Sequence, residues 1–271
     1  MSSFHRGDSK NYPENSLEAI ISAIHAGADN IEIDVYKTKD GVLVLMHEPT
    51  LDRCTDYYRK KGKDGLPTSN TVTDWTFEQL RQLRLVHGGR YTEYVIPTLE
   101  EVLTVCRGRT TIRLDRVEQW DWDADIYPLV RKTEAWEALV LSNSEDDVQM
   151  RQIRQLQDGG ADCVYGLRNF PHTHTSNWWQ YHLRLSGAGH PYILHWSGFQ
   201  IKEYRDYLTS AAVFTDAYKD ECRIHALCHN AEMENAEVWD TLYENGVDSI
   251  MVDNGVALCR YIAETFAPTE Y

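Results

Sequence analysis

The chain has 271 residues, of which 42% are hydrophobic and 25% are charged, and this composition indicates one large globular domain over residues 1–271. Its 42 acidic residues outnumber the 27 basic ones and give a net charge of −15, which argues against nucleic acid or an anionic membrane as a partner. No apolar run reaches the roughly 20 residues that cross a bilayer, and the N-terminus has no apolar signal segment. We therefore expect a cytoplasmic protein without a membrane-spanning segment.

The first strand is expected near residues 2–5, and the apolar spacing of SLEAIISAIHA predicts a helix over 16–26 directly after it. The other strands are expected near 29–35, 110–115, 138–142, 162–166, 191–195, 222–228 and 248–253. The other helices are expected at about 76–84, 98–106, 125–135, 146–157, 200–209, 233–244 and 256–265. Strands that alternate with helices in this way predict an α/β protein, a single (β/α)8 TIM barrel.

A short phrase marks three of the expected passages from helix to strand. Gly27-Ala28-Asp29, Gly160-Ala161-Asp162 and Gly246-Val247-Asp248 each follow an amphipathic segment and precede an apolar run. Glycine adopts the left-handed conformation that ends many helices, so each phrase indicates a helix end.

The second strand is expected to continue into a hairpin instead of a helix. Lys39-Asp40-Gly41 lies between two runs of alternating polarity, which is typical of a tight antiparallel turn. The hairpin returns the chain to the end of the second strand and brings His47 there.

Six cysteines are spread along the chain, at positions 54, 106, 163, 222, 228 and 259. No pair has the CxxC spacing of a zinc site, so we expect buried, reduced thiols and no zinc.

The second strand carries two carboxylates in the pentapeptide IEIDV, residues 31–35. Side chains two apart on a strand share a face, so Glu32 and Asp34 point into the barrel while the aliphatic residues face the helices. Buried carboxylates need compensation. Either a hard divalent cation, Mg²⁺ or Ca²⁺, binds them, or they pair with Arg6 and Arg113.

The N-terminal segment adds groups suited to phosphate chemistry. His5, Arg6 and Gly7 end the first expected strand, and Pro13-Glu14-Asn15-Ser16 opens the first helix. Active sites of such barrels are built from strand ends and the loops that follow them. Arginine matches phosphate oxygens, and imidazole titrates near neutral pH, so His5 and His47 could act as an acid and base pair.

Several motifs together resemble the glycerophosphodiester phosphodiesterase family. They are HRG, PENS, GADNIEIDVYKTKDGVLVLMHEPTLDRCT, IPTLEEVL and GVDSIMVDN, in the expected order, dense over about 4–105 and again at about 222–254. By this resemblance His5 and His47 are catalytic, Glu32 and Asp34 bind the metal, and Arg6 contacts the phosphate. Glu14 and Asn15 would support the loop, and Asn230 would support the site from the seventh strand, where Leu227 replaces the usual tryptophan.

The third strand departs from the family, in which a glutamate for the metal and a lysine for the phosphate stand two residues apart. Here TTIRLDRV offers Arg113 and Asp115 at those places. We expect the duties to be exchanged, with Asp115 on the metal and Arg113 on the phosphate. The alternative is a lost third ligand and weak or absent metal binding.

The expected function is a metal-dependent phosphodiesterase acting on a glycerophosphodiester or a related small-molecule phosphodiester. Aromatic residues at Trp178, Trp179, Tyr181 and Trp196 could stack on a sugar, or could pack helices onto the barrel. The rival hypotheses are a hydrolase or synthase of agrocinopine-type sugar phosphodiesters, a phospholipase D-like lyase that forms a cyclic phosphate, and a catalytically silent binding protein.

Overall fold

Eight parallel strands close into a ring in the computed structural model, which describes residues 1–116, 120–141, 146–161, 165–169, 192–196, 223–228 and 232–266. The strands are β1(Ser2–His5), β2(Asn30–Lys37), β6(Thr111–Asp115), β7(Leu139–Leu141), β8(Tyr165–Asn169), β9(Tyr192–Trp196), β10(Arg223–Leu227) and β11(Ser249–Val252). Strand β1 pairs with both β2 and β11, so the sheet has no open edge there. The predicted (β/α)8 barrel is confirmed.

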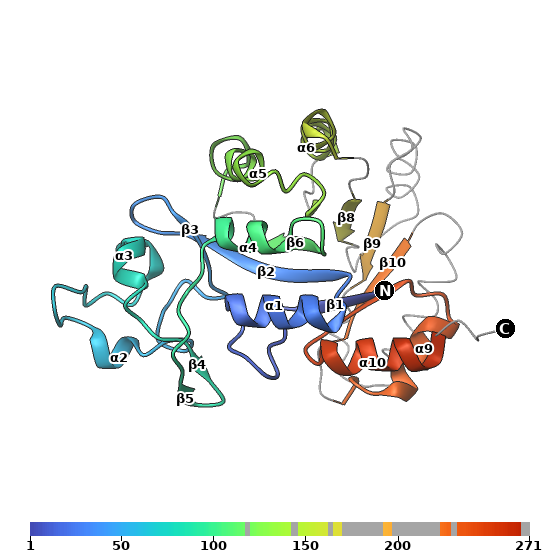
Figure 1. Cartoon of the computed structure of the whole chain (residues 1–271), viewed down its shortest axis with the longest axis horizontal. Coiled ribbons are helices and arrows are strands. Elements are labelled where there is room, and N and C mark those ends of the chain that lie inside the picture. Colours follow the sequence, from blue (N-terminus) through green and yellow to red (C-terminus); the bar gives the residue numbers. More distant parts are fainter. Residues whose placement is uncertain are drawn as a thin grey trace.

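Helices cover the outside of this sheet (Figure 1). They are α1(Leu17–Ala26), α4(Leu99–Cys106), the π-helical turn η3(Trp122–Ile126) with α5(Tyr127–Thr133), α6(Asp146–Gly159), α9(Ala236–Glu244) and α10(Gly255–Phe266). Helix α1 packs beside α4 and α10, so the chain's first and last helices are neighbours. The helix expected at 200–209 lies outside the described residues.

The alternation predicted for the second strand is present. Ile31, Ile33 and Val35 are fully buried in a hydrophobic cluster with residues of α1 and α4. Glu32 and Asp34 therefore face the barrel interior, where they are 2% and 1% exposed. The glycines of the three helix ends, Gly27, Gly160 and Gly246, have φ of 89°, 122° and 92°, as the repeated phrase predicted.

A large insertion separates β2 from β6. Strand β3(Leu43–Leu45) pairs antiparallel with the end of β2, which confirms the hairpin. Beyond it lie α2(Tyr57–Lys60), the 3-10 turn η1(Val72–Asp74), α3(Phe77–Leu80) and the hairpin β4(Val86–His87)–β5(Arg90–Tyr91), on the left of Figure 1. The insertion has a hydrophobic core of its own around Trp75, which is fully buried.

The helix expected over 76–84 is shorter than predicted. Helix α3 ends at Leu80 because the chain turns to bury Leu83 and Leu85 in the core of the insertion. The backbone N–H of Arg84 donates to Asp56 Oδ1 over 2.8 Å instead of continuing the helical pattern.

Cys54, Cys106, Cys228 and Cys259 are free thiols, while Cys163 and Cys222 lie outside the described residues. Within the described ranges, no helix combines the length and the apolar character that a membrane span requires.

Candidate active site

His5 and Arg6, at the end of β1, lie at the mouth of the barrel. Arg6 has a left-handed backbone with φ of 60°, and its N–H donates to Glu32 O over 2.9 Å. Gly7 follows with φ of 79°, and a Cβ there would come within 2.9 Å of the backbone of Ala19 in α1. This turn needs glycine, because α1 begins directly against it.

The PENS segment links the start of α1 to the second strand. Ser16 caps the helix by accepting from Ala19 N over 3.1 Å. Asn15, with φ of 58°, donates through Nδ2 to Asp34 Oδ2 over 2.9 Å and accepts from Asp34 N over 3.2 Å. These two hydrogen bonds fix the orientation of the Asp34 carboxylate.

Three carboxylates meet where β2 and β6 end. Glu32, Asp34 and Asp115 each offer an oxygen, and these oxygens lie within 4.8 Å of one another. The register pairs Asp34 with Asp115, so residues of neighbouring strands reach the same point. Glu32 Oε2 is buried and accepts no hydrogen bond within the described part of the chain. An all-oxygen, partly unsatisfied donor set fits a hard divalent cation.

Burial and mutual repulsion disfavour the ionised form of Glu32 and Asp34. Burial and the charge of Asp34 raise the pKa of Glu32 to about 7. Burial also raises the pKa of Asp34, although Arg6 and the hydrogen bond from Asn15 act in the other direction. A cation bound among them would remove this cost.

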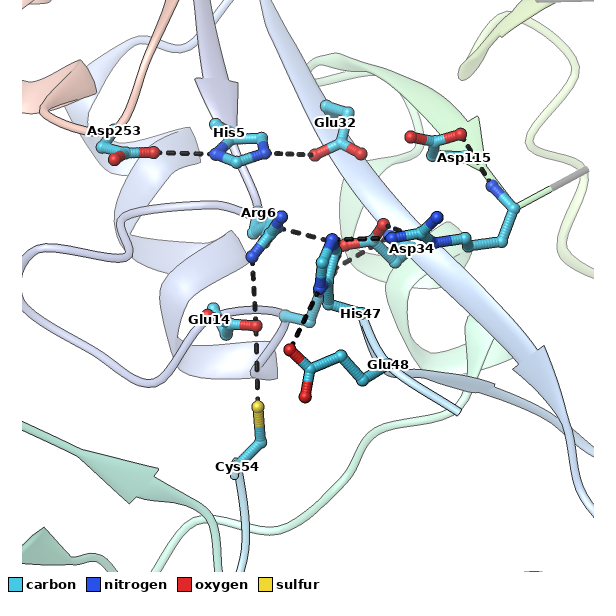
Figure 2. A network of polar contacts seen from close by, with 12 residues as sticks. His5, Arg6, Glu14, Glu32, Asp34, His47, Glu48, Cys54, Asp115 and Asp253 are labelled. Atoms are coloured by element: carbon cyan, nitrogen blue, oxygen red, sulfur yellow. Dashed lines mark hydrogen bonds and ion pairs between the residues drawn. The ribbon is translucent and has the colours of Figure 1, made fainter. Parts of the chain in front are cut away.

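His5 lies between two acids (Figure 2). Its Nδ1 is 2.7 Å from Asp253 Oδ1, just beyond the end of β11, and its Nε2 is 3.9 Å from Glu32 Oε2. Burial alone would lower the pKa of His5, but the hydrogen bond with Asp253 and the charge of Glu32 outweigh it and raise the pKa above 6.5. The ring is therefore held with a proton on Nδ1 and with Nε2 directed into the site.

His47 follows β3 and has a cationic neighbour. Arg116 Nη2 lies 2.7 Å from His47 Nε2. A guanidinium only donates, so Nε2 must be the accepting, unprotonated nitrogen. Burial and the charges of Arg6 and Arg116 lower the pKa of His47, against the charge of Asp34. The two histidines are thus biased toward opposite protonation states.

A ring of ion pairs surrounds these groups. Arg6 lies 3.3 Å from Glu14 and 3.3 Å from Asp34, and Arg53 of the insertion binds Glu14 through two nitrogens at 2.5 and 2.9 Å. Burial alone would raise the pKa of Glu14, but Arg53 and Arg6 lower it to about 2. Glu14 therefore stays ionised and joins the N-terminal loop to the insertion.

These residues border a cavity of about 960 Å³. Its barrel side is lined by His5, Arg6, Glu14, His47, Arg116 and Asp253, and its insertion side by Arg53, Cys54, His87 and Gly88. Figure 2 shows His5 and His47 on either side of Arg6, with Asp34 and Glu32 beside them. A phosphodiester bound here would meet both histidines, Arg6 and Arg116.

The structure gathers most of the expected site residues and adds others. His5, His47, Arg6, Glu14, Asn15, Glu32, Asp34 and Asp115 come together. Arg113 lies on β6 but is not among the cavity-lining residues, and Asn230 lies outside the described residues. The side chains of Trp178, Trp179, Tyr181 and Trp196 also lie outside the described part.

Sequence reasoning did not single out Arg116, Asp253 or His87, all of which line the cavity. Arg116 stands in the motif TTIRLDRV and Asp253 in the motif GVDSIMVDN, and their position near the ends of expected strands is a signal that the sequence carries. His87 lies in a hairpin that no pattern placed near the barrel.

Residues 5–133 match the model of the Glycerophosphoryl diester phosphodiesterase family. This match covers a little less than half of the chain, in its N-terminal part. It is 43% identical over 100 residues to a glycerophosphodiester phosphodiesterase of Caldanaerobacter subterraneus subsp. tengcongensis, a match covering 36% of this chain and 37% of the relative. It is 41% identical over 116 residues to glycerophosphodiester phosphodiesterase 1 of Mus musculus, covering 41% and 32%. The chain thus spans about a third of the length of these curated relatives.

Solved phosphodiesterase structures share the barrel fold. The enzyme of Parabacteroides distasonis superposes with a TM-score of 0.71 at 22% identity, over 100% of this chain and 88% of that one. A phosphodiesterase of Oleispira antarctica, solved with its product sn-glycerol-3-phosphate, has a TM-score of 0.63 at 21% identity, over 97% and 96%. At such low sequence identities, these superpositions show a shared barrel fold alone.

Proposed function

We propose that this protein is a metal-dependent phosphodiesterase that cleaves a glycerophosphodiester or a related small phosphodiester. The observation that carries the proposal is a cavity lined by two histidines and Arg6, with three clustered carboxylates directly behind its lining residues. The family match over residues 5–133 and the names of the relatives agree with this chemistry. The product bound by the Oleispira phosphodiesterase is a phosphate monoester of the kind that such a cleavage would release.

Glu32, Asp34 and Asp115 would hold the cation, either Mg²⁺ or Ca²⁺, because all three offer oxygen and Glu32 Oε2 accepts no hydrogen bond among the described residues. When bound, the cation would stabilise the negative charge that develops on the phosphoryl oxygens. Asn15 would keep Asp34 in place through its two hydrogen bonds.

Arg6 would bind the phosphate beside the carboxylates. Arg6 is turned into the cavity by its left-handed backbone, and Glu14 and Asp34 hold its guanidinium there. Positive groups fixed before the reaction lose little energy to reorganisation, so they favour the transition state over the free substrate.

The histidines would divide the proton transfers according to their surroundings. His47, with its lowered pKa and unprotonated Nε2, would act as the base that takes a proton from the nucleophile. His5, with its raised pKa and its hydrogen bond to Asp253, would act as the acid that protonates the leaving alkoxide. The nucleophile is water, or a neighbouring hydroxyl of the substrate.

Phosphorus NMR of a panel of diesters tests this function. The purified protein would be incubated in Mg²⁺, in Ca²⁺ and in EDTA with glycerophosphocholine, glycerophosphoethanolamine, a lysophospholipid and a sugar phosphodiester. We expect a phosphate monoester from at least one glycerophosphodiester, formed with metal and absent in EDTA. A cyclic phosphate would indicate the lyase, cleavage of the sugar diester alone would indicate the agrocinopine-type activity, and no product from any diester would favour a silent binding protein.

A further inference from the structure

Three charged residues stand at and just after the end of β6, the third strand of the barrel, and only the last of them lines the cavity. Arg113 and Asp115 belong to the strand, and Arg116 is the first residue after it. Among these, Arg116 lines the cavity. Resting on the proposed function, we propose that Arg116, in place of Arg113, is the second arginine that binds the phosphate.

The backbone explains how two adjacent residues serve one site. Successive side chains of an extended strand point to opposite faces, so Asp115 facing inward would send its successor outward. Arg116 breaks this alternation with a left-handed φ of 62°. Its N–H donates to Asp115 Oδ1 over 2.8 Å, which ties the turn to the carboxylate cluster. The turn returns the Arg116 side chain to the mouth of the barrel.

The guanidinium of Arg116 contacts both His47 and Asp34. Its Nη2 is 2.7 Å from His47 Nε2, and its Nε is 3.5 Å from Asp34 Oδ1. That Nε proton has no hydrogen-bond acceptor among the described residues. The side chain remains 32% exposed and lines the cavity. It is a fixed cation between a carboxylate of the cluster and a catalytic histidine.

Arg113 has different surroundings. It pairs in register with Glu32, and its charge acts on Glu32 and on the buried His225 of β10. Its Nη1 is buried and lacks an acceptor within the described ranges. The role of Arg113 is therefore to compensate the negative charge of Glu32 inside the barrel.

Binding of phosphate would also change what His47 can do. A neutral imidazole nitrogen is a weaker acceptor for a guanidinium than a charged phosphate oxygen, which arginine can bind through two parallel hydrogen bonds. The phosphate therefore draws Arg116 away from His47 Nε2. The lone pair of His47 is then exposed to the nucleophile only when substrate is present.

Binding of inorganic phosphate in Mg²⁺, measured by calorimetry, tests the assignment without requiring turnover. Arg116→Ala should weaken binding at least about tenfold, the loss expected for one charge-assisted hydrogen bond. Arg113→Met, which keeps the length of the side chain, should change binding less than threefold. Arg109→Ala removes the same charge from the opposite end of β6, where Arg109 is exposed, and should leave binding unchanged. Unchanged binding in Arg116→Ala, in a variant that keeps the wild-type circular dichroism, would overturn the assignment.

Nitrogen NMR of ¹⁵N-histidine-labelled protein tests the release of His47. Saturating phosphate should shift the His47 Nε2 resonance in the wild type, and this shift should be absent from Arg116→Lys if only a guanidinium spans both partners. A His47 resonance that does not move in the wild type would refute the release. If Arg116 controls phosphate binding while the wild type cleaves no diester, the assignment stands and the proposed function fails. Normal diester cleavage by Arg116→Ala would refute the role of Arg116 and leave the proposed function intact.

Discussion

Replacing Glu32 by glutamine should stabilise the metal-free protein, although it removes a proposed metal ligand. A glutamate ordinarily titrates near 4.5, and burial with the charge of Asp34 raises the pKa of Glu32 to about 7. The folded state therefore holds this proton more tightly than the unfolded state, and stability falls as pH rises from about 4.5 to about 7. Each pKa unit is worth about 1.4 kcal/mol, so the ionised side chain costs on the order of 3 kcal/mol at pH 8.

Glutamine has the same shape without the charge, so Glu32→Gln should recover up to about 3 kcal/mol of unfolding free energy at pH 8 in EDTA. The thermal midpoint should rise by roughly 6–12 °C. At pH 4 the two proteins should melt together, because both carry a neutral side chain there. Glu93→Gln makes the same change at an exposed position and should have no such effect.

Thermal melts with added Mg²⁺ or Ca²⁺ complete this test. The wild type should gain about 2.7 kcal/mol when the metal is at a hundred times its dissociation constant, and Glu32→Gln should gain much less. A variant no more stable than the wild type in EDTA at pH 8, or one stabilised equally at pH 4, would refute the reasoning about the carboxylate cluster.

Further predictions concern turnover. His5→Ala and His47→Ala should each lower turnover by at least about 10²-fold with the fold retained, and near-normal activity on the true substrate would remove that histidine from proton transfer. The profile of kcat/KM against pH should be bell-shaped, with its acid limb below 6.5, where His47 gains a proton, and its alkaline limb above 6.5, where His5 loses one. A monotonic rise into alkali would contradict this. Asp115→Asn should weaken metal affinity in a titration, and excess metal should partly restore its activity, whereas activity equally low at every metal concentration would count against Asp115 as a ligand.

The parts of the fold that follow from local pattern were predictable. The alternation in IEIDV placed Glu32 and Asp34 inside the barrel, because apolar residues on a strand must meet the helices. The helix ends marked by glycine and the Lys39-Asp40-Gly41 turn were equally predictable from the sequence. Both depend on backbone conformations that few residues other than glycine adopt.

The missed residues depend on backbone choices or contacts that a pattern does not carry. Arg116 reaches the cavity only because its own φ is positive, which is uncommon for arginine and leaves no periodic signal. Asp253 meets His5 because β11 closes the ring against β1, a pairing across nearly the whole chain. His87 arrives through the packing of the insertion, whose core is separate from that of the barrel.

The position of the metal tests the central claim most directly. Crystals grown in Mn²⁺, which favours the same carboxylate ligands, would be measured at a wavelength where manganese scatters anomalously. We predict one strong anomalous peak within about 2.6 Å of oxygens of Glu32, Asp34 and Asp115, between His5 and His47. No peak at this position, with the three carboxylates instead paired to Arg6, Arg113 and Arg116, would contradict a metal-dependent site.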